Sequence, residues 1–376
     1  MGKRGNGEGS IFRRKGGDWC GQYTVYTSEG RKRRTLYGKT RQEVAAKLSK
    51  ALADREGGLT FDAGTTTVGE YLARWLSHSV RDTVSQKTYE RYESIVRVHL
   101  SPALGRIRLK ALTPGHVRGL YREKLDAGLA PRTVLHIHRT LSKALKQATD
   151  DGLIPRNAAA SVKPPRPRSE EMQPLSRDQV QTFLDTVRGD RLEALYVLAV
   201  TAGLRQGELL ALKWEDVDLE GANPTLEVRR SLSETRGRRS FVTPKSGRGR
   251  HLRLSRRAVN ALRTHRKRQL EERVRKAGLW EDNGLVFPSE VGTPMSGRNL
   301  YRAFKIRVKR ASLPETLRFH DLRHTCATLL LKQGVNPKFV QDLLGHADIS
   351  LTLNTYSHVL PDMGDAAAGG MDAALG

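Results

Sequence analysis

The chain has 376 residues, 38% of them hydrophobic, and a formal net charge of +26 at pH 7. This length suffices for two or three domains with a sizeable core, and the absence of any run of 18 apolar residues excludes a membrane-spanning helix. No apolar segment follows the basic, Gly-rich start, so the sequence predicts no secretion signal. The only two cysteines, Cys20 and Cys326, lie in unrelated contexts, which favours a reduced protein of the cytoplasm.

The positive charge extends along the whole chain. Residues 1–60, 61–170 and 171–376 carry net charges of +8, +9 and +9, so no single basic tail or targeting segment explains the excess. A solvated surface explains individual lysines, but it does not explain an excess of positive charge in all three parts of the chain. Binding to a membrane surface would require a basic amphipathic helix with an aromatic face, which we do not find. The charge therefore indicates a polyanionic partner.

Residues 8–60 have the pattern of a small α+β domain. Three segments rich in aromatic and β-branched residues, 10–14, 19–27 and 33–38, are separated by turn sequences and followed by a helical pattern at 41–52. With this helix on one face of a three-stranded sheet, the other face would be open to a DNA groove. The side chains expected on that face are Arg13, Arg14, Arg31, Lys32, Arg33, Arg34, Trp19, Tyr23 and Tyr37. A basic sheet without a specific site is the alternative.

Residues 66–151 have a helical pattern throughout. Apolar residues at i, i+3 and i+4, each run preceded by a Ser, Thr or Pro start signal, predict helices at 68–78, 85–99, 113–126 and 131–150. Basic residues recur on these helices, namely Lys87, Arg91, Arg97, Arg132, His136, Arg139 and Lys143. The Pro-rich, charged stretch K-P-P-R-P-R-S-E-E then falls within 155–173. It cannot continue a helix and therefore predicts a linker to the next domain.

The segment after the linker contains a candidate guanidinium–carboxylate pair. An apolar helical pattern at 191–201 is followed by T-A-G-L-R-Q-G-E-L at 201–209, which opens another helix. Arg205 and Glu208 are three residues apart there, so the carboxylate can hold the guanidinium while its other N–H groups face outward. An ordinary surface ion pair is the alternative.

A basic turn lies farther along the same segment. Alternating sequences at 225–231 and 239–254 predict paired strands, and the second contains T-P-K-S-G-R-G-R, a flexible turn that carries Lys245. Three neighbouring cations could equally bind phosphate, namely Arg248, Arg250 and Arg253. Helices are predicted at 256–276 and 297–311, the first basic enough to face DNA or solvent.

The segment 318–358 gathers several imidazole, guanidinium and phenol groups, namely His320, Arg323, His324, His346 and Tyr356. The first three fall at i, i+3 and i+4, so a helix starting near His320 would present them on one face. A second helix is predicted at 337–344, and Gly345 would end it just before His346.

Such groups suit chemistry on a phosphodiester. A guanidinium fork grips two non-bridging oxygens, an imidazole holds or moves protons near neutral pH, and a phenol attacks phosphorus. A zinc site is one alternative, although zinc usually takes Cys or carboxylate partners at tight spacing and Arg323 would lie beside the metal. The other alternative is a basic, solvated helix with a buried Tyr.

The motifs also resemble a known family. H-x-x-R at 320–323, L-G-H at 344–346 and Tyr356-Ser357-His358, together with T-A-G-L-R-Q-G-E-L at 201–209, are similar to those of the tyrosine recombinase family, phage-integrase type, and occur in the right order. The resemblance implies a multidomain fold. Its parts would be a small α+β arm-type DNA-binding domain at 1–60, an all-α core-binding domain at 66–154, a linker at 155–173, a mainly α catalytic domain with a small β-sheet at 174–360 and a flexible tail at 361–376.

The resemblance further implies the catalytic set, which is Arg205, Lys245, His320, Arg323, His346 and the nucleophile Tyr356, with Glu208 in support. The two arginines would stabilise charge on the non-bridging oxygens, and Lys245 would protonate the leaving 5′ oxygen. His320 would assist proton transfer from Tyr356, and His346 would hydrogen-bond a phosphoryl oxygen. The product would be a 3′-phosphotyrosine link, formed without a metal or nucleotide cofactor.

Double-stranded DNA would be the partner, with arm sites bound by the N-terminal sheet and core sites bound by residues 66–360. The cations expected to contact it are Arg13, Arg14, Arg31, Lys32, Arg33, Arg34, Lys87, Arg91, Arg132, Arg139, Arg248 and Arg250. The resemblance implies a homotetramer on DNA, DNA-bending and directionality factors as further partners, and a place in the cytoplasm on the nucleoid.

Two other classes of protein remain as alternatives. A type IB topoisomerase would use the same chemistry to relax DNA in place, without an arm domain or partner subunits. A non-catalytic, basic DNA-binding regulator would keep the catalytic residues only as a remnant, and the complete set argues against it.

Overall fold

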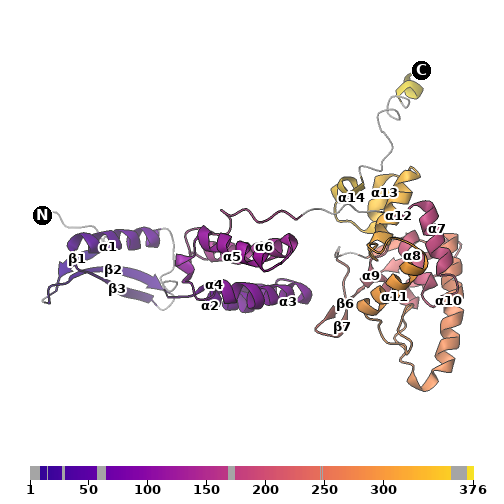
Figure 1. Ribbon diagram of the computed structural model, residues 1–376, viewed down its shortest axis with the longest axis horizontal. Helices are drawn as coiled ribbons and strands as arrows, with labels where there is room; N and C mark the ends of the chain where they lie inside the picture. The colour runs from indigo at the N-terminus through magenta and orange to yellow at the C-terminus, as the bar shows by residue number, and fades with distance from the viewer. Residues whose placement is uncertain are drawn as a thin grey trace. The chain divides into compact units, whose positions relative to one another are not determined.

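The computed structural model describes residues 9–14, 16–27, 30–56, 65–167, 174–245, 247, 249–356 and 371–376. Its contacts divide the chain into two compact units, Met1–Ser169 and Glu170–Gly376, whose elements are labelled in Figure 1. Among the predicted features, Arg248, His358, linker residues 168–173 and tail residues 361–370 lie outside the described residues. No helix in the described ranges is long and apolar enough to cross a membrane.

The first unit begins with the predicted three-stranded sheet and helix. The antiparallel strands are β1 (Ser10–Arg13), β2 (Trp19–Thr27) and β3 (Gly30–Gly38), in that order, and α1 (Arg41–Glu56) packs against them. The helix approaches the sheet so closely that a Cβ added at Gly21 would lie 2.9 Å from Cγ1 of Val44. Glycine at this position therefore allows the helix to cover the sheet.

The alternation of side chains along the strands corrects the expected DNA face. Tyr23, predicted on the open face, is 6% exposed and packs with Leu48 of α1. Arg34 is the cross-strand partner of Tyr23, so its side chain starts from the helix-covered face. Tyr37 belongs to the opposite face, and the guanidinium of Arg14 lies 5.9 Å from its ring centroid. The open face thus holds fewer of the predicted groups than the sequence indicated.

The rest of the first unit is all α, as predicted. Its elements are α2 (Val68–Arg74), η2 (Trp75–Val80), α3 (Gln86–Ile95), η3 (Val96–Leu100), α4 (Ser101–Leu104), η4 (Leu109–Ala111), α5 (Pro114–Asp126) and α6 (Pro131–Asp150). Thr67 begins α2 with a capping box, in which Glu70 accepts from the Thr67 N–H and donates its own N–H to the threonine oxygen. η2 and η3 are π-helical continuations of α2 and α3.

The second unit is mainly α with small sheets, as predicted. Its helices are α7 (Arg177–Thr186), α8 (Glu193–Thr201), α9 (Gln206–Ala211), α10 (Arg256–Arg275), α11 (Gly297–Arg310), α12 (Asp321–Lys332), α13 (Pro337–Leu344) and α14 (Ile349–Tyr356), with short turns η5 (Trp214–Asp216) and η6 (Ala277–Leu279). Helix α8 lies at the centre, because it contacts α7, α9, α10 and α12. Each residue from Ala194 to Val200 is at most 5% exposed, as expected for a helix that is apolar all round.

The strands of the second unit form two separate sheets. One has the order β4 (Val217–Asp218), β5 (Thr225–Val228), β8 (Arg250–Arg253), and the other is the hairpin β6 (Ser231–Thr235) with β7 (Arg238–Val242). The predicted pairing of 225–231 with 239–254 is confirmed for β5 with β8, whereas the separate hairpin of β6 with β7 was not expected. Arg236 and Gly237 have φ of 45° and 76°, the two positive values that favour a tight hairpin turn. Strand β7 therefore pairs with its neighbour β6, and β5 pairs with β8.

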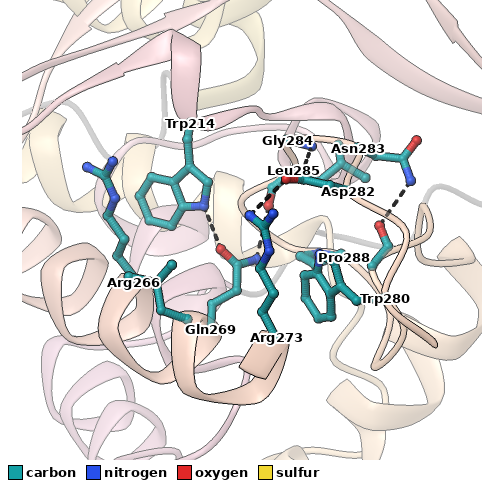
Figure 2. A pocket seen from close by; sticks show the side chains of 12 residues that line it. Trp214, Arg266, Gln269, Arg273, Trp280, Asp282, Asn283, Gly284, Leu285 and Pro288 are labelled. Atoms are coloured by element: carbon teal, nitrogen blue, oxygen red, sulfur yellow. Dashed lines mark hydrogen bonds and ion pairs between the residues drawn. The ribbon is translucent and has the colours of Figure 1, made fainter. Parts of the chain in front are cut away.

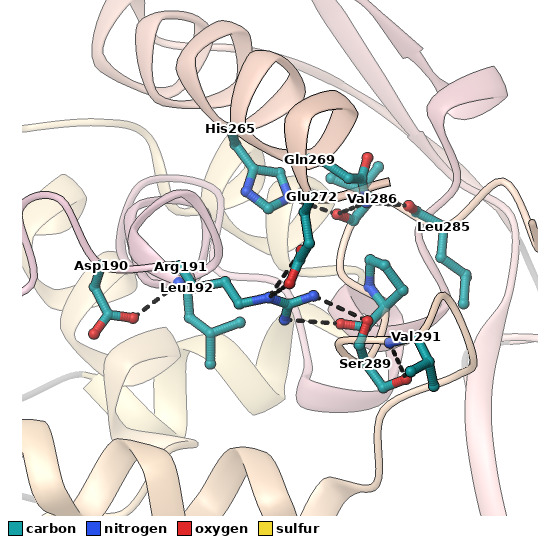
Figure 3. A network of polar contacts seen from close by, with 11 residues as sticks. Asp190, Arg191, Leu192, His265, Gln269, Glu272, Leu285, Val286, Ser289 and Val291 are labelled. Atoms are coloured by element: carbon teal, nitrogen blue, oxygen red, sulfur yellow. Dashed lines mark hydrogen bonds and ion pairs between the residues drawn. The ribbon is translucent and has the colours of Figure 1, made fainter. Parts of the chain in front are cut away.

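A polar network fastens the start of α8 to α10 (Figure 3). Arg191 donates through Nε to both oxygens of Glu272, at 2.9 and 3.1 Å. Its Nη1 and Nη2 donate to the carbonyl oxygens of Pro288 and Ser289, at 3.0 and 2.9 Å. The Arg191 guanidinium thus joins the start of α8 to α10 and to the loop at Pro288 and Ser289. These hydrogen bonds fix the relative positions of the three segments.

Candidate active site

Arg323 of α12 lies inside the second unit rather than on its surface. Arg323 is 2% exposed, and its Nη1 and Nη2 donate to the carbonyl oxygens of Gly203 and Leu344, at 2.7 and 2.5 Å. Gly203 has φ of 60°, and a Cβ there would lie 2.6 Å from Cδ2 of Leu344. A larger residue would push the two carbonyl-bearing segments apart, so this glycine allows both to reach Arg323.

Arg205 is held by the carboxylate three residues ahead of it, in the geometry that the spacing indicated. Its Nη1 donates to Oε1 of Glu208 at 2.8 Å, and its backbone N–H donates to Oε2 at 2.9 Å. Its Nη2 donates to the carbonyl oxygen of Gly345 at 3.1 Å. The Glu208 side chain is 1% exposed, so the pair is not an ordinary surface ion pair.

Arg250 has a different place from the DNA contact predicted for it. Its side chain is 10% exposed, and Nη1 and Nη2 donate to the two oxygens of Glu208 at 3.1 and 2.8 Å. Its Nε donates to the carbonyl oxygen of Leu343 at 2.9 Å. The physical reason is that a buried carboxylate with two oxygens needs more cationic partners than Arg205 alone supplies. Burial raises the pKa of Glu208, but the hydrogen bonds and charges of Arg250 and Arg205 outweigh it and lower the pKa to about 2.

Three guanidiniums therefore bind three consecutive carbonyl oxygens at the end of α13. Arg250 binds that of Leu343, Arg323 that of Leu344 and Arg205 that of Gly345. The last carbonyls of a helix carry its partial negative charge, which favours cations there.

His346 follows directly after these carbonyls. Its Nδ1 lies 2.9 Å from Oγ1 of Thr352, a fully buried residue of α14. Its backbone N–H donates to the carbonyl oxygen of Gln341, and the Gln341 amide donates back to the His346 carbonyl oxygen, each at 3.1 Å. The imidazole is thus fixed between the end of α13 and the helix that carries Tyr356.

Tyr356 is buried against an apolar cluster and bonded to an imidazole. The residue is 2% exposed and packs with Ala327, Leu331, Val340 and Leu344. Its hydroxyl lies 2.6 Å from Nδ1 of His324. Burial raises the pKa of this phenol above its usual value, while the nearby guanidinium of Arg323 opposes that change.

The partner of the phenol differs from the sequence-based expectation. His320 was predicted to take the Tyr356 proton, but its ring, at the N-cap of α12, instead meets that of His324 edge to face, with centroids 4.9 Å apart. The i, i+4 spacing correctly placed both rings together. It could not tell which of them faces α14, because that depends on tertiary packing.

The site combines cationic guanidiniums with neutral imidazoles near pH 7. Burial and the charge of Arg323 and Arg205 lower the pKa of His346 to about 4, and burial and the neighbouring His320 lower the pKa of His324 to about 4. The pKa of His320 is lowered too, by desolvation and by Arg323. Burial also lowers the pKa of Arg323 to about 9, which leaves it charged at neutral pH.

Lys245 lies apart from these contacts. It is exposed in the turn after β7, where the Gly247 N–H donates to the Pro244 carbonyl oxygen at 2.8 Å. No hydrogen bond or ion pair joins Lys245 to the other candidates within the described part of the chain. Arg253, also predicted as a phosphate contact, is exposed on β8.

The predicted DNA contacts of the first unit are exposed where they are described. Arg91 of α3 and Arg132 and Arg139 of α6 lie close enough to His136 to lower its pKa, after the larger effect of desolvation, so these three cations form one cluster. The other predicted DNA contacts of this unit that are exposed are Lys87, Arg13, Arg14, Arg33 and Arg34. Arg31 and Lys32 lie in β3, but their side chains fall outside the described residues.

A separate hollow of about 250 Å³ lies beside α10 (Figure 2). Trp214 and Trp280 line it, and the Trp214 indole N–H donates to the Gln269 amide oxygen at 2.5 Å. None of the predicted catalytic residues lines this hollow. In the described part of the chain, no three or more His, Cys, Asp or Glu side chains are placed to hold a metal ion.

Comparison with known proteins agrees with this arrangement. The phage integrase family matches residues 173–363, and the N-terminal SAM-like domain of phage integrases matches residues 67–125. A tyrosine recombinase XerC-like protein of Caldanaerobacter subterraneus subsp. tengcongensis is 31% identical over 349 residues, which are 88% of each chain. An integrase of Streptomyces ambofaciens is 30% identical over 332 residues, 85% of this chain and 83% of that one.

Solved structures show a similar fold. The Tn1549 transposon integrase in complex with a circular intermediate DNA superposes with a TM-score of 0.69 at 24% identity, over 82% of this chain and 100% of that one. A lambda integrase dimer bound to a core site superposes with a TM-score of 0.56 at 21% identity, over 96% and 97% of the two chains.

The fold and the cationic site with a tyrosine define a DNA strand transferase that works through a tyrosine. The chain belongs to the phage integrase family and is a tyrosine recombinase. The resemblance found in the motifs and the predicted fold class are thereby confirmed.

The lowered imidazole pKa values predict how the free protein titrates. We expect His324 and His346 to titrate near pH 4 and His320 below its usual range, because each is desolvated beside cations. Between the unfolded pKa of about 6.5 and these lower values the unfolded chain binds more protons, so stability should fall as pH drops from 6.5 toward 5. NMR of the imidazole protons and thermal unfolding across this range measure both effects. Titration of all three rings near pH 6.5 would contradict the prediction.

Proposed function

We propose that this recombinase is a site-specific integrase that cleaves and rejoins DNA through Tyr356. The phenol oxygen attacks the scissile phosphorus, the bond from phosphorus to the 5′ oxygen breaks, and a 3′-phosphotyrosine link remains with a free 5′ hydroxyl. The observation that supports this most directly is the Tyr356 hydroxyl 2.6 Å from His324, next to the guanidinium of Arg323. Attack by a 5′ hydroxyl of another duplex on the link reverses the step and exchanges strands.

Proton transfer is assigned to two groups in this proposal. His324 takes the Tyr356 proton, because its lowered pKa of about 4 leaves the imidazole neutral and able to accept. Lys245, on its exposed turn, gives a proton to the leaving 5′ oxygen. His320, whose ring meets that of His324 edge to face, then supports His324 rather than acting on the phenol itself.

Arg205, Arg323 and His346 bind the phosphate in this proposal. The two guanidiniums are fixed by carbonyl oxygens on the same turn, so their remaining N–H groups can meet charge that grows on the non-bridging oxygens. For His346 we assign the tautomer with the proton on Nε2, because Thr352 can donate to Nδ1. Nε2–H then donates to a phosphoryl oxygen. Glu208 supports Arg205.

Tyr356 has to leave its buried place to reach a phosphate. It is the last residue of α14, and the helix presents two apolar side chains to solvent, Ile349 at 36% and Leu353 at 37% exposed. We infer that DNA binding or a neighbouring subunit moves α14.

The expected partners are two kinds of DNA site. The helical part with Arg91, Arg132 and Arg139 binds core DNA, and the N-terminal sheet with Arg13, Arg14 and Arg33 binds arm DNA. We further propose a homotetramer on DNA, assisted by DNA-bending and directionality factors and associated with the nucleoid of the cytoplasm. The solved lambda integrase structures include a dimer on a core site and a tetramer on a Holliday junction, which supports the tetramer.

A type IB topoisomerase would share the cleavage chemistry. The basic N-terminal sheet favours the integrase, because DNA relaxation needs no second DNA-binding module. Strand exchange between two duplexes, as opposed to relaxation of one, separates the two functions.

An integrated mobile element should leave a repeated core sequence on its two sides, and a nicked duplex with this core sequence tests the nucleophile. Tyr356→Phe should bind this core duplex but form no covalent adduct, because only the attacking oxygen is lost. The matched control is Tyr301→Phe, a change at a tyrosine that is 42% exposed on α11, and it should keep the wild-type adduct yield. Denaturing gels measure the adduct. An adduct with Tyr356→Phe at the wild-type level would assign the nucleophile elsewhere.

The proton acceptor can be tested through the pH dependence of the same reaction. His324→Ala should slow adduct formation by about 100-fold or more at pH 7, and its rate should then rise with pH, because the phenol must ionise without a base. His320→Ala should leave the pH profile closer to that of the wild type. A rate that rises with pH in His320→Ala and not in His324→Ala would return the role to His320.

The two-site arrangement can be tested by deleting residues 1–60. The truncated protein should cleave the core duplex normally but lose roughly a hundredfold or more in assembly on a full attachment site, because tethered modules raise the local concentration of each other. Footprinting should show protection outside the core only with the full-length chain. Identical footprints would leave a recombinase with a basic, nonspecific leader.

A further inference from the structure

Arg250 occupies the point where three parts of the proposed catalytic machinery meet. It is the first residue of β8, five positions after Lys245, and it is fixed in the sheet by pairing with Val228 of β5. Its guanidinium binds both oxygens of Glu208, which in turn binds Arg205. One buried carboxylate thus connects the end of the lysine-bearing turn to the guanidinium proposed to bind phosphate.

The geometry around Glu208 shows what Arg250 does for Arg205. With both oxygens already bonded to Arg250, the guanidinium of Arg205 reaches the carboxylate through Nη1 alone, and its Nη2 donates to the carbonyl oxygen of Gly345. Without Arg250 the buried carboxylate would be undersatisfied, and a bidentate pair with Arg205 would be favoured instead. That rotation would turn the Arg205 fork away from a phosphate.

Arg250 also determines where His346 lies. Its Nε holds the carbonyl oxygen of Leu343, and the chain turns sharply at Gly345, with φ of 63°. A Cβ at Gly345 would lie 3.0 Å from Nη1 of Arg250, so the turn fits directly against the guanidinium. His346 is the next residue.

We propose that Arg250 is a positioning residue, which aligns Arg205 and His346 and anchors the Lys245 turn without touching the DNA. The inference rests on the proposed function, because it assumes that these three groups act on the scissile phosphate. It replaces the direct DNA contact that the sequence suggested for Arg250.

A matched control exists in the same domain. Arg191 likewise binds both oxygens of a glutamate, Glu272, and two backbone carbonyl oxygens (Figure 3). Its side chain is 29% exposed, and its partners include no predicted catalytic residue. Replacing Arg191 therefore removes a similar set of bonds and reports only on structural support.

The experiment compares full-length Arg250→Gln and Arg250→Lys with Arg191→Gln. For each we would measure the melting temperature, the affinity for the core duplex and the single-turnover rate of adduct formation on saturating core duplex. Arg250→Gln should slow adduct formation by roughly 10- to 100-fold, the usual effect of losing a residue that orients a reacting group, with affinity changed less than about threefold. Arg250→Lys should recover part of the rate, because it restores charge but not the fork.

Arg191→Gln should lower the melting temperature but keep the adduct rate within about threefold of the wild type. In a double-mutant cycle, Arg250→Gln should add little to the loss caused by Glu208→Gln, because both act through Arg205. Equal rate losses for Arg191→Gln and Arg250→Gln, or full additivity in the cycle, would overturn the proposal.

Three further outcomes distinguish the inference from the function on which it rests. A parallel fall of affinity and rate in Arg250→Gln would show that Arg250 contacts DNA and would overturn the inference alone. Absence of any Tyr356-dependent adduct from the wild-type protein on the core duplex would overturn both. A Tyr356-dependent adduct that forms at the wild-type rate in Arg250→Gln would refute the positioning role and leave the proposed function standing.

Discussion

The buried carboxylate of Glu208 is the interaction on which the rest of the site depends. A charge that is 1% exposed is stable only when cations and hydrogen bonds replace the lost water, and Arg205 and Arg250 supply both. Removing one partner of such a buried pair usually costs about 3–5 kcal/mol. The carboxylate therefore fixes α9 and β8 together, although the residues involved are far apart in the sequence.

Three guanidiniums at one helix end would repel one another without compensation. Glu208 compensates part of their charge, and the carbonyl oxygens of Leu343, Leu344 and Gly345 meet the rest with the negative end of a helix. Three cations against one carboxylate still leave an excess of positive charge. A phosphate that binds here would neutralise this excess of positive charge. The hydrogen-bond donors are already fixed in place and need no rearrangement to bind it.

The sequence predicted the local features of the site and missed those made by packing. The i, i+3 spacing of Arg205 and Glu208 anticipated their ion pair, and Asn336 to Gly345 gave the bounds of α13. No local pattern could join Arg250 to Glu208, because that contact depends on how β8 meets α9. The pairing of β6 with β7 was, in contrast, readable from the turn signal Arg236-Gly237.

The alternation rule would likewise have assigned Tyr23 correctly. Tyr23 stands two residues from Gly21, on the same face of β2, and a glycine at that position indicates the close approach of another element. The remaining predicted roles, from Lys245 to the arm contacts, stay predictions until they are measured.

The proposed nucleophile, Tyr356, is buried in the free protein, and its release costs free energy. Exposing the Tyr356 ring would cost about 2 kcal/mol, and this free energy separates the buried from the released phenol. It corresponds to roughly a 30-fold preference for the buried state. Such a difference suppresses attack by the free protein, yet a few new contacts to DNA or to the exposed side chains of Ile349 and Leu353 would suffice to reverse it. The fixed cations and the movable tyrosine therefore have separate tasks, because the first must be rigid to stabilise charge and the second must wait for the assembled complex.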